Sequence, residues 1–251
     1  MDDRAVTACV LIIGNEILSG RTQDVNLNHI ALTIGGWGIQ VREARVVPDI
    51  DSAIVDAVNY ARTTYDYVFT TGGIGPTHDD ITADCIAAAF GVPIVINETI
   101  ADLIRQRPAP SDVMEARMRM ARVPEGAQLV DNATGGPPGF RVDNVYVMAG
   151  IPGVMQAMLA SLEGKLKSGP VVRSRSVTAF LGESQIAGAL REIQDQFPSI
   201  DLGSYPFVKQ DRYGTSLVMR GTDETLLDQM LELVKAAIVA AGETPQDVQH
   251  G

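Results

Sequence analysis

TTGGIGPTHDDIT, at residues 70–82, joins a short apolar run to a segment with helical periodicity. Its glycines Gly72, Gly73 and Gly75 let main-chain N–H groups approach a ligand where a Cβ atom would block them. The helix that follows adds unpaired N–H donors and the positive end of its dipole. The stretch therefore predicts an anion-binding turn between a strand and a helix.

Two adjacent carboxylates, Asp79 and Asp80, follow the glycines. They would repel a phosphate in the turn, so they predict either a bridging divalent cation or proton transfer. Helix capping is the alternative, because Thr77 and Asp80 have the spacing of a capping box. One helix end needs only one such cap, so we expect at least one of the two aspartates to act on the ligand.

The flanking sequence alternates between strand and helix patterns. Strands are predicted at 8–13, 39–47, 66–71 and 145–149, and helices at 27–34, 50–61, 81–90, 97–106, 112–121 and 154–162. Strand runs that are apolar on both faces indicate a mostly parallel sheet with helices on both sides. We therefore predict a three-layer α/β fold.

The pattern changes near residues 165–170. Beyond them, strands and helices follow in the order β-α-β-β-α, without a cluster of catalytic residue types. We expect a first domain at 1–168, a small α+β domain at 169–243 and a polar tail at 244–251.

Glycine turns follow three of the predicted strands, at Gly14, at residues 72–75 and at Gly150. In open α/β sheets the ligand crevice lies beyond the carboxyl ends of the strands. The three turns are therefore expected to line one crevice, although strand-to-helix turns favour glycine for other reasons too.

Two further carboxylates follow strands. Glu16 stands just beyond the first strand, where a carboxylate needs a partner that a ligand or a metal would supply. A surface turn with Asp24 as the N-cap of the next helix is an equally good interpretation. Asp49 follows the second strand and would orient a substrate or a water, although capping is the better interpretation of an isolated aspartate.

Arginines precede a second glycine-rich loop. Arg117, Arg119 and Arg122 come shortly before residues 134–140, and guanidinium groups suit phosphate oxygens. Pairing of Arg119 with Glu115 on a solvated helix face is slightly favoured over phosphate binding.

Composition excludes several classes of protein. The net charge of −11 argues against binding to nucleic-acid backbones, which usually requires a basic surface. Cys9 and Cys85 have no metal-ligand spacing, so we expect two buried thiols in a reducing compartment. No apolar run approaches a membrane span, and the first residues lack a signal-peptide layout. We therefore expect a cytoplasmic protein without nucleic-acid or membrane partners.

Taken in order, these motifs resemble those of the molybdopterin-binding (MoaB/Mog-like) superfamily, in its CinA-like branch. Residues 70–82 resemble its TTGGxGPTxDDxT signature, and GNEILSG at 14–20 resembles GDExLxG. Shorter matches are Asp24 and Asn26 to DTN, 123–127 to PEGA, 138–140 to APGF and 149–152 to PGVP. The resemblance covers residues 8–165, and the later unit resembles the small KH-like domain of CinA proteins. The pattern also resembles the molybdopterin-binding-like domain of eukaryotic FAD synthases.

The chain departs from the family pattern at three places. Asn15 replaces the aspartate of GDE, and Val154 replaces the acid of PGVPxEM. The family's NxKQA reads RMRMA at 117–121. The two lost carboxylates weaken a direct transfer of CinA chemistry to this chain.

The resemblance implies a nucleotide or pterin phosphate as ligand, with molybdopterin among the candidates. The leading expectation is a metal-dependent pyrophosphatase acting on substrates of the ADP-ribose or FAD type. Adenylyl transfer to molybdopterin and non-catalytic binding are the alternatives. Self-association to a homodimer or homotrimer is also implied.

Residue roles follow from the same matches. Asp80 and Asp49 are expected to be catalytic, and Asp79 and Asp80 to hold a divalent metal such as Mg²⁺. Ligand contacts are expected from Gly14, Glu16, Ser19, Asn26, Thr71, Gly72, Gly73, Gly75, Pro76, Thr77, Thr82, Arg119, Gly150 and Pro152.

Overall fold

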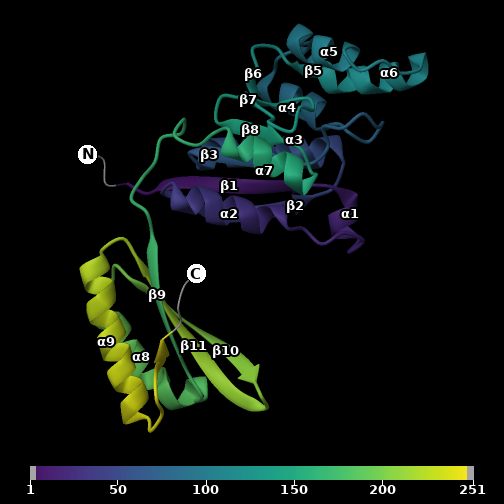
Figure 1. The fold of residues 1–251 in the computed structure, drawn as a ribbon. Coiled ribbons are helices and arrows are strands. Elements are labelled where there is room, and N and C mark those ends of the chain that lie inside the picture. The colour runs from purple at the N-terminus through teal and green to yellow at the C-terminus, as the bar shows by residue number, and fades with distance from the viewer. Residues whose placement is uncertain (1–3, 248–251) are drawn as a thin grey trace. The chain divides into compact units, whose positions relative to one another are not determined.

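A computed structural model describes residues 4–247 of the chain (Figure 1). The chain forms two compact units, one ending at Gly169 and the other beginning at Pro170. The main-chain N–H of Gly169 donates to Gly38 O at 3.1 Å, which ties Gly169 to the first unit.

The first unit is built on a six-stranded sheet in the order β2-β1-β3-β8-β7-β6. Its strands are β1 (Val6–Ile13), β2 (Ile39–Val47), β3 (Tyr67–Thr71), β6 (Gln128–Val130), β7 (Gly139–Val142) and β8 (Val145–Met148). The first four strands in this order are parallel, and β7 runs antiparallel to both of its neighbours. The predicted mostly parallel sheet is therefore confirmed.

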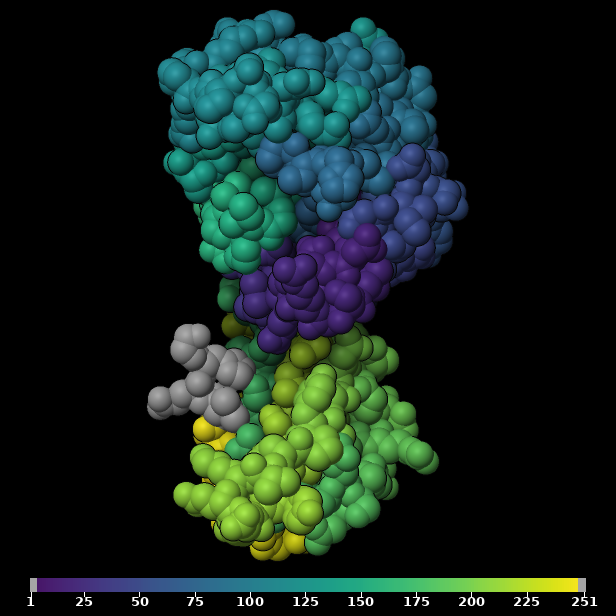
Figure 2. Space-filling view, turned by 90° about the vertical axis from the view of Figure 1, so that its right-hand side faces the viewer, coloured from purple at the N-terminus to yellow at the C-terminus, as the bar shows by residue number. Residues whose placement is uncertain are grey.

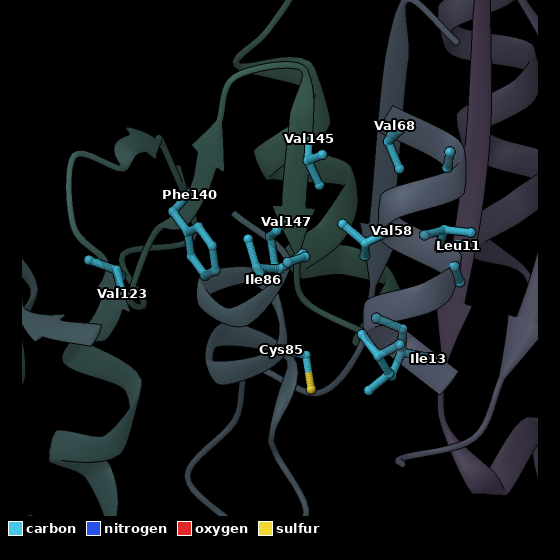
Figure 3. Close-up of a cluster of buried hydrophobic side chains, with 14 of the residues drawn as sticks. Leu11, Ile13, Val58, Val68, Cys85, Ile86, Val123, Phe140, Val145 and Val147 are labelled. Atoms are coloured by element: carbon cyan, nitrogen blue, oxygen red, sulfur yellow. The ribbon is translucent and has the colours of Figure 1, made fainter. Parts of the chain in front are cut away.

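Helices cover both faces of this sheet, because side chains alternate along each buried strand. Leu11 and Ile13 of β1 belong to a core with α3 (Asp51–Thr64), α4 (Thr82–Phe90) and α5 (Glu98–Arg105). Figure 3 shows Val58 of α3 near Leu11, and Ile86 of α4 beside Val147 and Phe140. The intervening residues of β1 pack in a second core with α2 (Asn26–Gly36) and α7 (Pro152–Ala160). This arrangement confirms the three-layer prediction.

The short elements differ from the sequence prediction. A two-stranded antiparallel sheet joins β4 (Ile94–Ile96) to β5 (Arg122–Pro124), and neither strand was predicted. The predicted helix at 112–121 is α6 (Ser111–Met118) followed by a 3₁₀ turn, η1 (Arg119–Ala121). A four-residue helix, α1 (Asn15–Leu18), occupies the turn after β1. The strands β6 and β7 also escaped prediction, because three or four residues are too short to show a period, whereas β8, equally short, was predicted from its continuous apolar run.

The second unit is a four-stranded antiparallel sheet, in the order β10-β11-β9-β12, with two helices. Its elements are β9 (Arg173–Ala179), α8 (Glu183–Gln196), β10 (Asp201–Lys209), β11 (Arg212–Gly221), α9 (Glu224–Ala240) and β12 (Gln246–Asp247). The predicted β-α-β-β-α order is present, and β12 extends it. Gln246 and Asp247 therefore pair with β9, where the sequence analysis placed a polar tail. Residues 248–251 of that tail lie outside the described residues.

Strand β10 forms one edge of this second sheet. The N–H of Leu202 donates to Gln194 Oε1 at 2.9 Å, so it points away from the neighbouring strand β11. The register between β10 and β11 is continuous, so main-chain positions alternate between the partner strand and the free edge. The main chain therefore faces the free edge at Ser204, Pro206 and Val208, as it does at Leu202.

Among residues 4–247, no helix is long and apolar enough to cross a membrane. Both cysteines are buried, as predicted. Burial, with the nearby Asp51 and Asp84 carboxylates, raises the pKa of the Cys85 thiol to about 12. Burial raises the pKa of Cys9 to about 12 as well, so neither thiol is a nucleophile at neutral pH.

Candidate functional site

A cavity of about 560 Å³ lies at the carboxyl ends of β1, β3 and β8. Its polar and main-chain lining comes from Glu16, Gly72, Gly73, Gly75, Asp80, Asp84, Arg119, Arg122, Asn132, Thr134 and Gly150. Figure 2 shows surface from the start of the chain, from the region near residue 75 and from the region near residue 155 adjoining on one face of the first unit. Two of the three expected glycine turns, at residues 72–75 and at Gly150, therefore meet at one crevice, whereas Gly14 does not line it and its turn contributes Glu16 instead.

The turn after β3 is held by contacts that only glycine permits. Gly72 has φ +101°, and a Cβ there would lie 2.1 Å from Ile13 O. Gly73 has φ +67°, and a Cβ there would lie 2.1 Å from Thr82 Oγ1. The Thr82 hydroxyl donates to Gly72 O at 3.0 Å. Thr82 is fully buried and does not line the cavity, so its part in the site is to shape the turn.

Asp80 lies at the cavity wall in a fixed position. Its Oδ2 accepts hydrogen bonds from the Thr77 main-chain N–H at 2.8 Å and from the Thr77 hydroxyl at 2.5 Å. Gly75 makes room for this carboxylate, since a Cβ at that position would lie 2.6 Å from Oδ2. The Thr77–Asp80 bond matches the capping-box spacing, but α4 begins only at Thr82 and has no side-chain cap. No described residue engages Asp80 Oδ1, which leaves it for a ligand.

Asp79 points elsewhere. Its side chain is 62% exposed and does not line the cavity. The nearby Thr77 side chain, the main-chain N–H of Asp79 and the nearby His78 hold the pKa of Asp79 below its usual range, although the hydroxyl proton of Thr77 is donated to Asp80 Oδ2. The structure therefore does not bring the two adjacent aspartates together as metal ligands.

Glu16 reaches the cavity from the short helix α1. Its carboxylate folds back over the end of β1, because a Cβ on Gly14 would lie 2.5 Å from both carboxylate oxygens. Among residues 4–247, none donates a hydrogen bond to this carboxylate. Asp24 Oδ1 accepts from Leu27 N at 2.9 Å at the start of α2, as the alternative interpretation expected, while the exposed carboxylate of Glu16 stays open to a ligand at the cavity.

Other expected site residues hold the loops instead of lining the cavity. Asp49 Oδ2 accepts from Asn15 N at 2.8 Å, so it holds the start of α1, whereas α3, the helix that follows Asp49, has Ile50 at its N-cap and no side-chain cap. Ser19 Oγ donates to Glu16 O at 3.2 Å. Neither Asp49 nor Ser19 faces the cavity, because both side chains are engaged with the main chain of α1.

Asn26 joins the third glycine turn to α2. Its Nδ2 donates to Gly150 O at 2.8 Å, and its buried Oδ1 has no hydrogen-bond partner among residues 4–247. Asn26, Thr71 and Pro152 line a smaller hollow of about 70 Å³ behind Gly72. They therefore support the floor of the main cavity, whereas Pro76 lies at the cavity itself.

Arg119 is the arginine that remains available to a ligand. It lines the cavity, and its Nε is buried without a hydrogen-bond partner among the described residues. Arg117 instead donates to Arg107 O at 3.2 Å. No ion pair joins Glu115 to Arg119 in the described part of the chain, so the phosphate-binding interpretation of Arg119 is favoured over the solvated pair.

Sequence reasoning missed Asp84 as a cavity residue. Asp84 Oδ1 lies 2.6 Å from Arg122 Nη2, and both residues line the cavity. No helical spacing to Asp80 could have marked it, because Asp80 lies outside α4 and Asp84 inside it. The partner Arg122 is 38 residues away in sequence, in a strand that was not predicted.

The remaining cavity wall is mostly apolar. Its side chains are Ile74, Ala83, Met120, Pro137, Pro138, Phe140, Val154 and Met158. A flat heterocyclic ring would bury its faces against such a wall, while its phosphate lies at the glycine turn.

A divalent ion fits this site only with help from a substrate. No group of three or more His, Cys, Asp or Glu side chains is arranged for a metal within residues 4–247. Asp80 still offers Oδ1, and Mg²⁺ is commonly bound through one or two carboxylates plus substrate phosphates and water. The donor set therefore suits an ion that arrives with a phosphorylated ligand.

Two family models match the chain. A model described as a probable molybdopterin binding domain matches residues 9–168, which is more than half of the chain. A second model, the middle domain of FAD synthase, matches residues 171–246. The chain therefore belongs to the molybdopterin-binding domain family.

Individual relatives agree with this assignment. A protein of Archaeoglobus fulgidus is 33% identical over 201 residues, which cover 78% of this chain and 84% of that protein. A probable FAD synthase of Caenorhabditis elegans is 28% identical over 265 residues, covering 93% of this chain and 51% of that protein. The crystal structure of CinA from Thermoplasma acidophilum, a protein of unknown function, has 33% identity and a TM-score of 0.60, covering 64% of this chain and 98% of that one. The resemblance to CinA-like proteins and to FAD synthases is thus confirmed.

Proposed function

We propose that this protein hydrolyses the pyrophosphate bond of a dinucleotide-type substrate such as ADP-ribose or FAD, releasing AMP. One observation carries the proposal. The cavity brings together a glycine turn, a fixed carboxylate and an arginine that pairs with no described residue. These are the groups that hold a phosphate chain and offset the charge that develops on it.

Each group has a distinct part in binding. The main-chain amides around Gly73 and Gly75 approach the phosphate oxygens, because no Cβ stands in the way. Arg119 contacts the phosphate from the wall opposite that turn. Asp80, through its free Oδ1, would hold a divalent ion that arrives with the substrate. When bound, that ion supplies neutralisation of phosphate charge.

Glu16 suits the role of proton acceptor. Its carboxylate lies at the cavity and receives no hydrogen bond from the described residues. As a water oxygen bonds to one phosphorus, the bond from that phosphorus to the bridging oxygen breaks. Glu16 accepts the water proton, and the bridging oxygen leaves on the other phosphate.

The test is direct. Purified protein is incubated with ADP-ribose or FAD, with Mg²⁺ or with EDTA, and AMP is measured by chromatography. Metal-dependent AMP release is the expected result, and its absence with every divalent metal tried would overturn the proposal.

A non-catalytic binding function is the second candidate, and Val154 favours it. This apolar side chain lines the cavity where the family pattern has an acid. Calorimetry distinguishes the two, because tight nucleotide binding without turnover supports the second candidate alone. Formation of adenylylated molybdopterin from ATP would instead indicate a transferase.

A further inference from the structure

The ion pair between Asp84 and Arg122 occupies the cavity wall beside the phosphate site. Asp84 lies in the first turn of α4, and Arg122 begins β5. Their side chains are 42% and 34% exposed, so both remain open to the cavity. The mechanism proposed above uses neither residue.

The position of Asp84 suits the sugar that carries the phosphate. Asp80 lies two residues before α4, Asp84 lies in the first turn of that helix, and both line the same cavity. The 2′- and 3′-hydroxyls of a nucleotide belong to the same ribose that carries the 5′-phosphate. A phosphate held at Asp80 would therefore place its own ribose near Asp84.

Charge explains why a carboxylate can stand so near a phosphate. An unpaired Asp84 would repel the ligand, whereas Arg122 at 2.6 Å compensates its charge. A carboxylate accepts about four hydrogen bonds, so the bond from Arg122 leaves acceptor positions for two hydroxyl donors.

We propose that Asp84, held by Arg122, accepts hydrogen bonds from the 2′- and 3′-hydroxyls of the substrate ribose and thereby selects against a 2′-phosphate. The proposal rests on the proposed phosphate site. Acidic residues read ribose hydroxyls in dinucleotide-binding proteins, and a nearby arginine accepts a 2′-phosphate instead. The chain thus has both kinds of residue at the cavity, and Arg122 forms an ion pair with Asp84.

A purely structural role would be to join α4 to β5. That role predicts that loss of Asp84 lowers the melting temperature and leaves ligand preference unchanged. Ligand preference is therefore the property to measure.

Calorimetry on the full chain tests this without turnover, with AMP, 2′,3′-dideoxy-AMP and adenosine 2′,5′-bisphosphate as probes. The wild type is expected to bind AMP about 10-fold or more tightly than either of the other two, since each lost or repelled contact involves a charged group. Asp84→Ala leaves Arg122 unpaired, so adenosine 2′,5′-bisphosphate should become the tightest of the three probes.

Glu98→Ala is the matched control, because Glu98 is also an arginine-paired acid in the first turn of a helix, away from the cavity. It should leave the order of the three affinities as in the wild type.

Three results would overturn the inference: equal wild-type affinity for AMP and 2′,3′-dideoxy-AMP, an unchanged order in Asp84→Ala, or no AMP binding at millimolar concentration. A failure of the proposed hydrolysis is recognised separately, as normal AMP selectivity without AMP release from ADP-ribose or FAD.

Discussion

The carboxylates that follow β1 and β3 are built alike and held differently. Each carboxylate occupies space that a Cβ atom on a nearby glycine would fill. Gly14 makes room in this way for Glu16, and Gly75 makes room for Asp80. Asp80 receives two hydrogen bonds from Thr77, whereas Glu16 receives none from the described residues. A fixed oxygen suits a ligand with strict geometry, such as Mg²⁺. A carboxylate without fixed donors is free to accept a proton and move.

The largest effect is expected from Asp80→Asn. Loss of the fixed charge should lower kcat about 10³-fold, while nucleotide affinity measured by calorimetry changes little. Asp79→Asn is the matched control, because the neighbouring side chain lies outside the cavity, and its kcat should stay near the wild-type value. Equal losses in the two variants would contradict the assignment of Asp80 alone.

Removal of the Glu16 carboxylate should have the next largest effect. Glu16→Gln keeps the shape of the side chain and removes its ability to accept a proton, so kcat should fall about 10²-fold with little change in KM. Steady-state kinetics on ADP-ribose provide the measurement. A large rise in KM at constant kcat would show instead that Glu16 binds the substrate.

Substituting alanine for Gly75 and for Gly14 compares how firmly the carboxylates of Asp80 and Glu16 are held. Gly75→Ala must displace a carboxylate held by Thr77, so it should lower both kcat and the free energy of unfolding, the latter by about 1–2 kcal/mol. Gly14→Ala displaces only the unanchored end of Glu16, so it should lower kcat with a smaller loss of stability. Urea unfolding and kcat are measured for both variants, and a reversed order of stability would contradict the difference in anchoring.

The smallest expected effect concerns Thr77. Thr77→Val removes a hydroxyl whose proximity favours the charged form of Asp79 and whose proton Asp80 Oδ2 accepts, so the pKa of Asp79 should rise toward its usual value. Carboxyl-carbon NMR titration measures this shift. Thr77→Ser keeps the hydroxyl and should leave the pKa low. The valine variant should also lose several-fold in kcat, because Asp80 is then less firmly held.

Long, regular elements could be predicted from the sequence. The strand at 39–47 and the helices around Ile30 and Ile86 repeat their apolar residues often enough to show a period. The glycine turn at 72–75 was predictable because its backbone conformation requires glycine. Short strands such as β5 depend on tertiary pairing, which leaves no local signal.

Site residues divide in the same way. Glu16 and Asp80 were predictable as cavity residues, because each lies in the loop that follows a strand end facing the crevice. The orientation of Asp79 away from the cavity was not, since two adjacent residues carry the same chemical signal. The Asp84–Arg122 pair combines residues from two separate elements, so only the fold could reveal it.

The exposed edge of β10 has a consequence for self-assembly. Main-chain N–H groups on this edge could form hydrogen bonds with a strand of another chain. The N–H of Leu202, however, already donates to Gln194, and Pro206 has no N–H. Too few donors remain for a continuous ladder with another chain. This protection discourages fibre growth from the second unit at the high concentrations used for purification.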